Sequence, residues 1–195
     1  MPKLPPEGFF IEEIYPSING GRFPVKRVVG ETIEVWADIF RDGHDVVAAD
    51  LIWRREPDRD WQRSPMIHNG NDRWVGVFVP EQPGRYIYAI EAWTDTFATW
   101  RRGFEQKQKA GVAGELDALE GAALLPKALA GGREATAKIT RYCNDFFGSG
   151  AADILLSDEL KKAMAEGQPR RDITRSTPLP IIVDRERARF SAWYE

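Results

Sequence analysis

Histidine, cysteine and closely spaced carboxylates are the side chains of this sequence that could do chemistry, and they are few. The two histidines, His44 and His68, fall in predicted turns, and only His44 has carboxylates beside it, in Asp42-Gly-His-Asp45. One imidazole with two carboxylates could hold a metal ion weakly, but such short polar residues are more typical of a solvated turn. The lone Cys143 lies on the apolar stripe of a predicted helix, which favours a buried thiol. We therefore predict no catalytic residue, no metal site and no cofactor in this chain.

Other reaction types lack their usual patterns. Gly20-Gly21-Arg22 has neither the spacing of a phosphate-binding loop nor a following helix, and no nucleophile-elbow pattern supports a Ser-His-Asp triad. Carboxylate pairs are plentiful, but none is distinctive, and glycoside chemistry needs two carboxyl groups held across a sugar. The arginines of residues 170–189 alternate with carboxylates, which favours a salt-bridged surface over a phosphate site. A self-contained small enzyme is therefore the least favoured hypothesis.

Aromatic rings are more informative. The chain has 7 tryptophans, and all but one precede residue 101. Tryptophan and tyrosine rings stack on the apolar faces of sugars and also anchor protein interfaces. Trp36 and Trp53 lie on predicted strands and are expected in the core or half-buried. The candidate binding residues, for a glucan or for a domain interface, lie nearer strand ends or loops and are Trp61, Trp74, Trp93 and Trp100. Ordinary packing is an equal alternative for each.

The stretch from Gly84 to Trp100 holds two of these rings. Its first half predicts a strand that is apolar on both faces, and its second half predicts a polar bend that carries Asp95 and Phe97. A buried strand that ends in rings and charges is either a packing corner or a surface that meets a sugar or another protein.

Antiparallel β structure is predicted for the first hundred residues. Residues 31–40, 45–54 and 73–79 alternate between apolar and polar positions, as half-buried strands do. The alternating apolar residues are Ile33, Val35, Ala37 and Ile39, then Val47, Ala49, Leu51 and Trp53, then Val75, Val77 and Val79. Asp42-Gly43 predicts a hairpin between the first two strands. Short strands separated by Gly, Pro and Asp turns favour an immunoglobulin-like antiparallel β-sandwich.

Helical periodicity replaces the alternation after residue 106. Val112, Leu116, Leu119 and Ala123 share one stripe, and further helices are predicted over residues 134–147 and 153–166. In the last of these, Leu156, Leu160, Ala163 and Met164 are expected to face inward. The chain is thus predicted to have a mixed fold. Its domains are a β-sandwich of residues 1–106 plus 170–190, a small α-helical bundle inserted as residues 107–169, and the start of a link to a missing domain at residues 191–195.

Size, charge and cysteine content set the remaining bounds. The 195 residues suit one domain with a smaller insert, and the net charge of -3 gives no support for a nucleic-acid partner. No apolar run approaches the roughly 20 residues needed to cross a bilayer, and residues 1–7 lack an apolar signal core. A single cysteine excludes an intrachain disulfide. We expect a cytoplasmic protein that binds neither nucleic acid nor membrane.

Short stretches spread over nearly the whole chain form a more specific pattern. They are Asn19-Gly-Gly-Arg-Phe-Pro-Val-Lys26, Val29-Gly-Glu31, Phe40-Arg-Asp-Gly-His-Asp45, Asp72-Arg-Trp74, Glu91-Ala-Trp-Thr-Asp95, Thr99-Trp-Arg101, Thr174-Arg-Ser176, Pro178-Leu-Pro180, Val183-Asp-Arg-Glu-Arg187 and Trp193-Tyr-Glu195. In this order the chain resembles the N-terminal part of the bacterial α-1,4-glucan:maltose-1-phosphate maltosyltransferases, which belong to the α-amylase superfamily. The helical segment resembles the family only in length and pattern.

The resemblance implies an all-β N-domain interrupted by a helical-bundle insert. Members of the family extend glycogen-like α-glucans with maltosyl units from maltose 1-phosphate, by a retaining mechanism on a (β/α)8 barrel. Their nucleophile and acid/base would lie beyond Glu195, so the chain alone is not expected to be an enzyme, although its parent would be a glycosyltransferase. The expected partners are the catalytic barrel of the same parent chain and a second copy in a homodimer. The alternative is an α-glucan-binding β-sandwich module.

Overall fold

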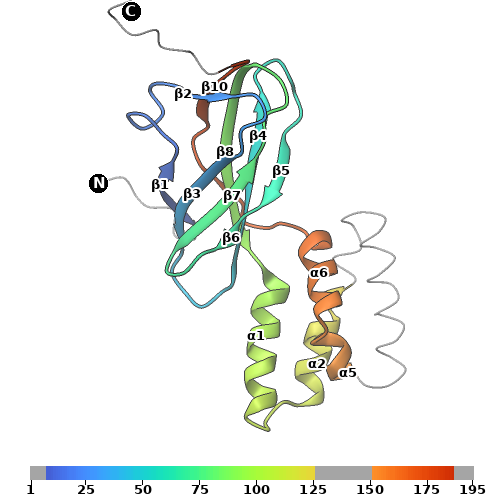
Figure 1. The fold of residues 1–195 in the computed structure, drawn as a ribbon. Coiled ribbons are helices and arrows are strands. Elements are labelled where there is room, and N and C mark those ends of the chain that lie inside the picture. The colour runs from blue at the N-terminus through green and yellow to red at the C-terminus, as the bar shows by residue number, and fades with distance from the viewer. Residues whose placement is uncertain (1–7, 126–150, 187–195) are drawn as a thin grey trace, which may run out of the picture. The chain divides into compact units, whose positions relative to one another are not determined.

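The computed structural model describes residues 8–125 and 151–186, and its fold is mixed α and β (Figure 1). The described residues divide into two compact units. One, the β unit, comprises residues 8–42, 47–93 and 173–186, and the other, the helical unit, comprises residues 43–46, 94–125 and 151–172. The helix predicted for residues 134–147, Cys143 and residues 191–195 lie outside the described residues.

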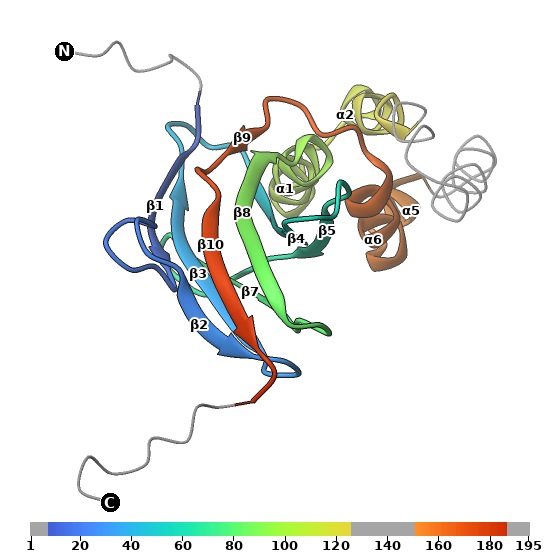
Figure 2. The ribbon, with the colours of Figure 1, turned by 90° about the horizontal axis from the view of Figure 1, so that it is seen from above.

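Two sheets form the β unit. The first sheet has the strand order β1-β3-β7-β6, and all its pairs are antiparallel. Its strands are β1 (Phe10–Tyr15), β3 (Ile33–Phe40), β7 (Arg73–Phe78) and β6 (Ile67–His68). The second sheet has the order β2-β10-β8-β4-β5, with β9 paired to β8 (Figure 2). Its strands are β2 (Val25–Val28), β10 (Leu179–Asp184), β8 (Gly84–Thr94), β4 (Val47–Arg55), β5 (Gln62–Pro65) and β9 (Thr174–Arg175). The sheets are not wholly antiparallel, because β2 and β10 pair in parallel.

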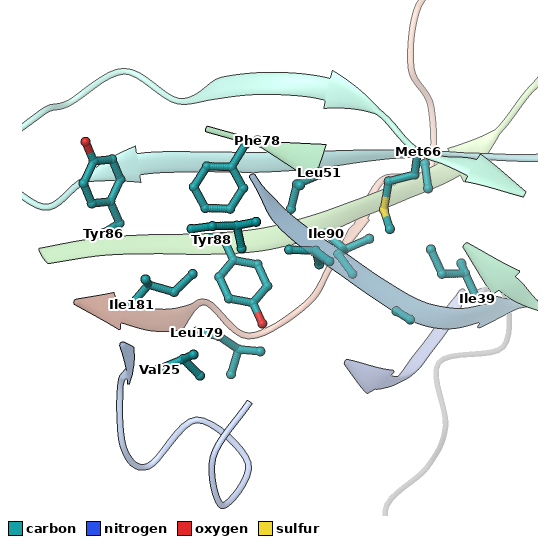
Figure 3. Packing of buried hydrophobic residues seen from close by; sticks show 14 of the residues in the cluster. Val25, Ile39, Leu51, Met66, Phe78, Tyr86, Tyr88, Ile90, Leu179 and Ile181 are labelled. Atoms are coloured by element: carbon teal, nitrogen blue, oxygen red, sulfur yellow. The ribbon is translucent and has the colours of Figure 1, made fainter. Parts of the chain in front are cut away.

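One hydrophobic core is shared by the two sheets, and its side chains meet between them (Figure 3). The alternation predicted for β3 is confirmed, because Val35 and Ala37 are fully buried in this core. In β4 the predicted inner residues also reach the core, but the strand does not alternate, because Asp50 and Ile52 on its other side are buried too. Tyr88 reaches across it, and its hydroxyl donates a hydrogen bond of 2.7 Å to the carbonyl of Pro16. The prediction that β8 is apolar on both faces is also confirmed, because the strand is buried without a break over residues 88–93.

Two β predictions fail. β3 and β4 do not form a hairpin, because they belong to different sheets and Asp42-Gly43 lies in the connection between them. In β7 the alternating valines point away from the core, and Val77 is 49% exposed. The inner positions of this strand are taken by Trp74 and Phe78, which pack into the core.

The helical unit contains α1 (Thr96–Lys109), α2 (Glu115–Ala122), α5 (Ala151–Leu155) and α6 (Asp158–Gly167). The polar bend predicted after Trp93 is instead the start of α1, which begins before the predicted boundary at residue 106. The Asp95 carboxylate accepts from the amide of Ala98 at 2.8 Å and so caps the helix. Phe97 and Phe104 then fall on its buried face.

The predicted inward residues of the last helix are buried at Leu160, Ala163 and Met164. The single helix predicted over residues 153–166 is broken, because the hydroxyl of Ser157 accepts from the amide of Leu160 at 3.2 Å and starts a new helix there. Helix α2 is present as predicted, but its apolar stripe faces solvent, with Leu116 78% exposed.

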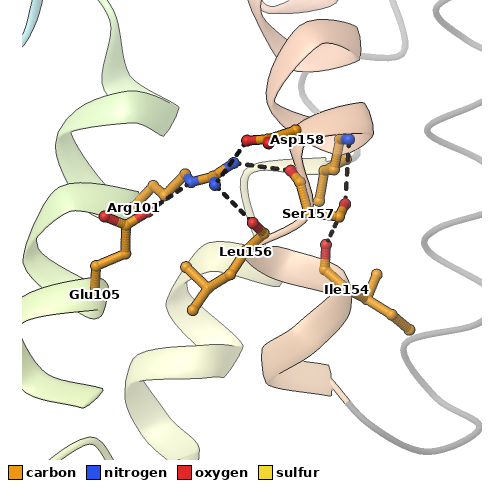
Figure 4. A network of polar contacts seen from close by, with 7 residues as sticks. Arg101, Glu105, Ile154, Leu156, Ser157 and Asp158 are labelled. Carbon is orange, nitrogen blue, oxygen red and sulfur yellow. Dashed lines mark hydrogen bonds and ion pairs between the residues drawn. The ribbon is translucent and has the colours of Figure 1, made fainter. Parts of the chain in front are cut away.

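Arg101 joins the helices of this unit (Figure 4). From α1 its guanidinium donates to the carbonyl oxygens of Ser157 at 2.8 Å and Leu156 at 2.6 Å. Its Nε atom donates to the Glu105 carboxylate at 2.9 Å, and the side chain is only 11% exposed. The planar guanidinium of Arg101 therefore satisfies the backbone carbonyls of Leu156 and Ser157, just before α6, and holds this segment against α1.

Candidate functional site

The four candidate tryptophans do not form one cluster. Trp100 lies in the helical unit, where its Nε1 atom donates to the carbonyl of Asp117 at 3.0 Å and its ring stacks on Phe104 with centroids 5.0 Å apart. Trp93 lies on β8 and is 4% exposed. Both rings are therefore used in packing within the chain.

The other two candidate rings belong to opposite sheets. Trp74 lies on the inner side of the first sheet, packs on the core and meets the edge of the His68 ring with centroids 5.2 Å apart. Trp61 precedes β5 in the second sheet, and the guanidinium carbons of Arg54 and Arg175 lie 5.1 and 5.4 Å from its ring centre. Trp61 thus contacts two cations, which is favourable for an indole.

A larger group of rings covers the outer side of the first sheet, which we call the aromatic face and define as Phe10, Tyr15, Trp36, Asp38, Phe40 and Arg73. The strand register places Tyr15 opposite Trp36 and Phe10 opposite Phe40. Their centroids are 5.1 and 5.2 Å apart and their planes differ by 16° and 14°. Two rings lying edge to edge in one plane would have centroids farther apart than this, so the rings of each pair are stacked with their faces overlapping.

Arg73 completes the stack. Its guanidinium carbon is 3.9 Å from the centre of the Trp36 ring, and its Nη2 atom donates to the Asp38 carboxylate at 3.2 Å. The hydrogen bond from Arg73 holds the pKa of Asp38 below its usual value. Strands β1 and β7 flank β3, so Tyr15 and Arg73 cover opposite faces of Trp36. Neither face of the Trp36 ring is therefore free.

Aliphatic side chains continue this surface across β7 and β6. Ile67 lies opposite Val75 and is 73% exposed, and Val77 is also exposed. An apolar strip that begins with stacked rings and continues into exposed Ile and Val suits contact with another protein surface. Trp36 and Tyr15 were not among the binding residues predicted from the sequence. The available signal was the alternation of residues 31–40, which places Trp36 on the polar side with Glu34 and Asp38.

A second polar group lies on the outer side of the second sheet. Arg63 donates to Asp50 at 3.2 Å and to Glu91 at 3.4 Å, and Arg175 donates to Glu91 at 2.9 Å. The two carboxylates are buried, with Asp50 4% and Glu91 3% exposed. Burial raises the pKa of Asp50 to about 6, Arg63 opposes this shift and Glu91 adds to it.

A buried carboxyl group with a raised pKa beside a second carboxyl group is also the arrangement of an acid/base pair. Here both carboxylates are enclosed and accept from arginines, so their charges are compensated within the sheet. The arrangement links β4, β5, β8 and β9 and is best explained as structural.

The described ranges contain neither a metal-ligand cluster nor a helix suited to span a membrane. Asp42, His44 and Asp45 are exposed, and no three His, Cys, Asp or Glu side chains of residues 8–125 and 151–186 are grouped as a metal site would require. None of the helices in these ranges is both long and apolar enough to cross a membrane.

Comparison with known proteins identifies the chain. Residues 8–185 match the family model described as alpha-1,4-glucan:maltose-1-phosphate maltosyltransferase, domain N/S. The enzyme of that name from Myxococcus xanthus is 41% identical, and the match covers 95% of this chain and 30% of the relative. Those from Rhodospirillum rubrum and Chlorobaculum tepidum are 39% and 36% identical and are covered to 30% and 28% of their length. The chain thus spans less than a third of these relatives. It belongs to the maltosyltransferase family and corresponds to its N/S domain.

Proposed function

We propose that this chain is the non-catalytic N-terminal region of an enzyme that extends α-1,4-glucans with maltosyl units from maltose 1-phosphate. The family match supports this assignment, since the chain corresponds to a named domain and to 28–30% of the three relatives described above. The described residues add support, because their one buried acid pair is already compensated by arginines. In this proposal the reacting groups belong to the catalytic barrel of the parent chain, in the cytoplasm.

The observation that carries the structural role is the aromatic face. Stacked rings on β1 and β3 and exposed Ile67 and Val77 form an apolar strip on one side of the first sheet. Exposing such a strip to water is unfavourable by roughly 25 cal/mol per Å². A surface of the parent chain that covers it would recover this free energy, and ring edges pack well against side chains. We therefore place the contact with the catalytic barrel here.

A charge introduced on this face tests the role. In the full-length parent, Ile67→Lys with Val77→Lys is expected to lower both the unfolding temperature and maltosyl transfer. In the 195-residue chain alone the same pair should leave the unfolding temperature nearly unchanged, because both side chains are already exposed. Gln108→Lys, on an exposed position of α1, is the matched control. Unchanged stability and transfer in the parent would refute the contact.

Homodimer formation is the second part of the proposed role. It is supported by exposed apolar side chains in α2 and in the segment before it, where Val112, Leu116 and Leu119 are 69%, 78% and 44% exposed. Leu116→Lys is then expected to weaken the dimer in analytical ultracentrifugation, whereas Glu166→Lys, at an exposed position of α6, should not. If the two variants have equal dimer dissociation constants, the proposal that these residues form the dimer interface is wrong.

Two architectural proposals accompany this role. The β unit is taken to be of immunoglobulin type, and the insert is taken to run from residue 94 to 172 rather than from 107 to 169, because α1 belongs to the helical unit. Trp61, Trp74, Trp93 and Trp100 are proposed as packing or interface residues rather than glucan platforms, since their rings contact the protein.

A further inference from the structure

A hollow at one end of the β unit is not used by the proposed support role. It lies between the segment that joins β4 to β5 and the segment that joins β7 to β8, and it holds about 80 Å³ of space. Its walls combine two aromatic side chains, Trp53 and Tyr86, with side chains that carry amides and carboxylates. All of these residues belong to the β unit.

Hydrogen bonds within the walls hold the hollow open in a defined shape. Arg55 donates to the Gln82 side chain at 2.5 Å and to the Asp58 carboxylate at 3.4 Å. The hydroxyl of Tyr86 donates to the carbonyl of Gln82 at 3.0 Å. The bond between Arg55 and Gln82 joins the two segments across the hollow, and the other two bonds fix the conformation within each segment, so a ligand would meet a preformed site.

Two polar side chains of the lining remain without a partner. Gln62 and Glu81 line the hollow, and neither side chain makes a hydrogen bond or ion pair within the part of the chain that the structure describes. A carboxylate accepts hydrogen bonds and an amide both donates and accepts, which suits a pair of neighbouring hydroxyl groups. An anionic ligand would be repelled by Glu81, and the positive charge of Arg55 is already offset by Asp58. A neutral polyhydroxyl ligand fits best.

The aromatic wall points to the same ligand class. Phe78 stacks on one side of Trp53, with centroids 5.0 Å apart and planes 22° from parallel. The part of the indole that reaches the hollow is therefore its other face or its rim, where the apolar hydrogens of a sugar ring can pack. The space is small beside the roughly 300 Å³ at which small-molecule pockets begin. It can take the hydroxyl-bearing edge of one sugar unit, but not a whole chain.

We propose that this hollow binds the terminal glucosyl unit of an α-1,4-glucan. Gln62 and Glu81 receive neighbouring hydroxyls of the chain end, and Trp53 and Tyr86 support the apolar edge of the ring. The choice of glucan rests on the proposed function, because family membership supplies the polymer, whereas the site itself rests on the lining residues.

Titration of the 195-residue chain with maltohexaose, followed by tryptophan fluorescence and calorimetry, tests the site. We expect a dissociation constant on the order of 1 mM, because few groups make contact. Glu81→Ala and Gln62→Ala should each weaken binding about fivefold, as expected for loss of one hydrogen bond. Both side chains are exposed, so the unfolding temperature should not change. Glu34→Ala removes an exposed glutamate from β3 and should leave the affinity unchanged.

Three results would overturn the proposal. They are no binding at tens of millimolar maltohexaose, binding unaffected by both hollow variants, and equal binding of cellohexaose, whose β-linkage presents a different chain shape. The support role is tested separately by the charged variants of the aromatic face in the parent enzyme. If the charged variants impair the parent enzyme but the 195-residue chain does not bind maltohexaose, the glucan site is refuted and the support role is not.

Discussion

Gly121 allows α2 to pack against Trp100, and replacing it with alanine should reverse the usual effect of that change. A Cβ atom built on Gly121 would stand 2.2–2.5 Å from three atoms of the Trp100 ring. The ring has little freedom to retreat, because Nε1 is bonded to the Asp117 carbonyl at 3.0 Å and Phe104 is stacked on the ring. The substitution is therefore an overpacking change at a position that is helical and buried.

The magnitude follows from two opposing terms. Alanine in place of glycine favours a helix by up to about 1 kcal/mol, whereas overpacking a filled core costs about 1–3 kcal/mol. With three ring atoms in conflict we expect the upper half of that range, so Gly121→Ala should lower the free energy of unfolding by about 1–2 kcal/mol. Gly103→Ala is the matched control, because Gly103 lies within α1 and a Cβ there meets nothing within 4 Å. That change should stabilise the chain by about 0.5–1 kcal/mol.

Urea unfolding of the 195-residue chain, followed by circular dichroism, gives both values. The difference between the two variants, about 2 kcal/mol, isolates the contact with Trp100 because the helix term is common to both. In a Trp100→Leu background the cost of Gly121→Ala should disappear. Equal effects of the two glycine substitutions, or an undiminished cost in that background, would refute this account of the packing.

Three further predictions concern polar groups. Burial raises the pKa of Asp50 from 3.8 to about 6, so its folded form binds a proton more tightly. At about 1.4 kcal/mol per pH unit, Asp50 should lower stability by about 3 kcal/mol as pH rises from 3.8 through 6. Urea unfolding at pH 4 and 7.5 should show this loss in the wild type and not in Asp50→Asn. Tyr88→Phe should cost about 1–3 kcal/mol by leaving the Pro16 carbonyl buried and unpaired, which thermal unfolding would reveal; a neutral result would exclude that bond. Arg101→Lys keeps the positive charge but cannot make both guanidinium hydrogen bonds to the carbonyls of Leu156 and Ser157. Amide hydrogen exchange at the start of α6 should therefore become faster, whereas Arg102→Lys, at an exposed position, should not change it.

Alternation predicted strand faces well where one side of a strand is polar and failed where both sides carry apolar residues. In β3 the inner positions are aliphatic and the outer ones include Glu34 and Asp38, so the pattern has one solution. In β7 one side of the strand carries the valines and the other carries Trp74 and Phe78, so either side could face the core from the sequence alone. The structure buries the side with the aromatic rings. Choosing between such sets requires knowledge of the facing sheet, which local sequence does not hold.

Turn chemistry was a weaker guide than periodicity. The Asp42-Gly43 pair does form a turn, and Gly43 has a positive φ of 109°. The strands on either side pair with partners distant in sequence, so the local signal could not reveal the change of sheet. Asp95 was likewise predicted to lie in a bend, but it caps α1. The helical spacing of Phe97, Trp100 and Phe104 was a signal for this helix that the prediction did not use.

Ring faces, rather than the number of rings, determine what each surface can bind. On the aromatic face both sides of Trp36 are covered, by Tyr15 and by Arg73, so a sugar ring cannot stack on this indole. In the hollow Phe78 stacks on one side of Trp53, and the side chains of Gln62 and Glu81 line the same hollow. The same type of side chain therefore supports a protein contact at one place and a sugar contact at the other. This separation follows from strand neighbours that no single stretch of sequence contains.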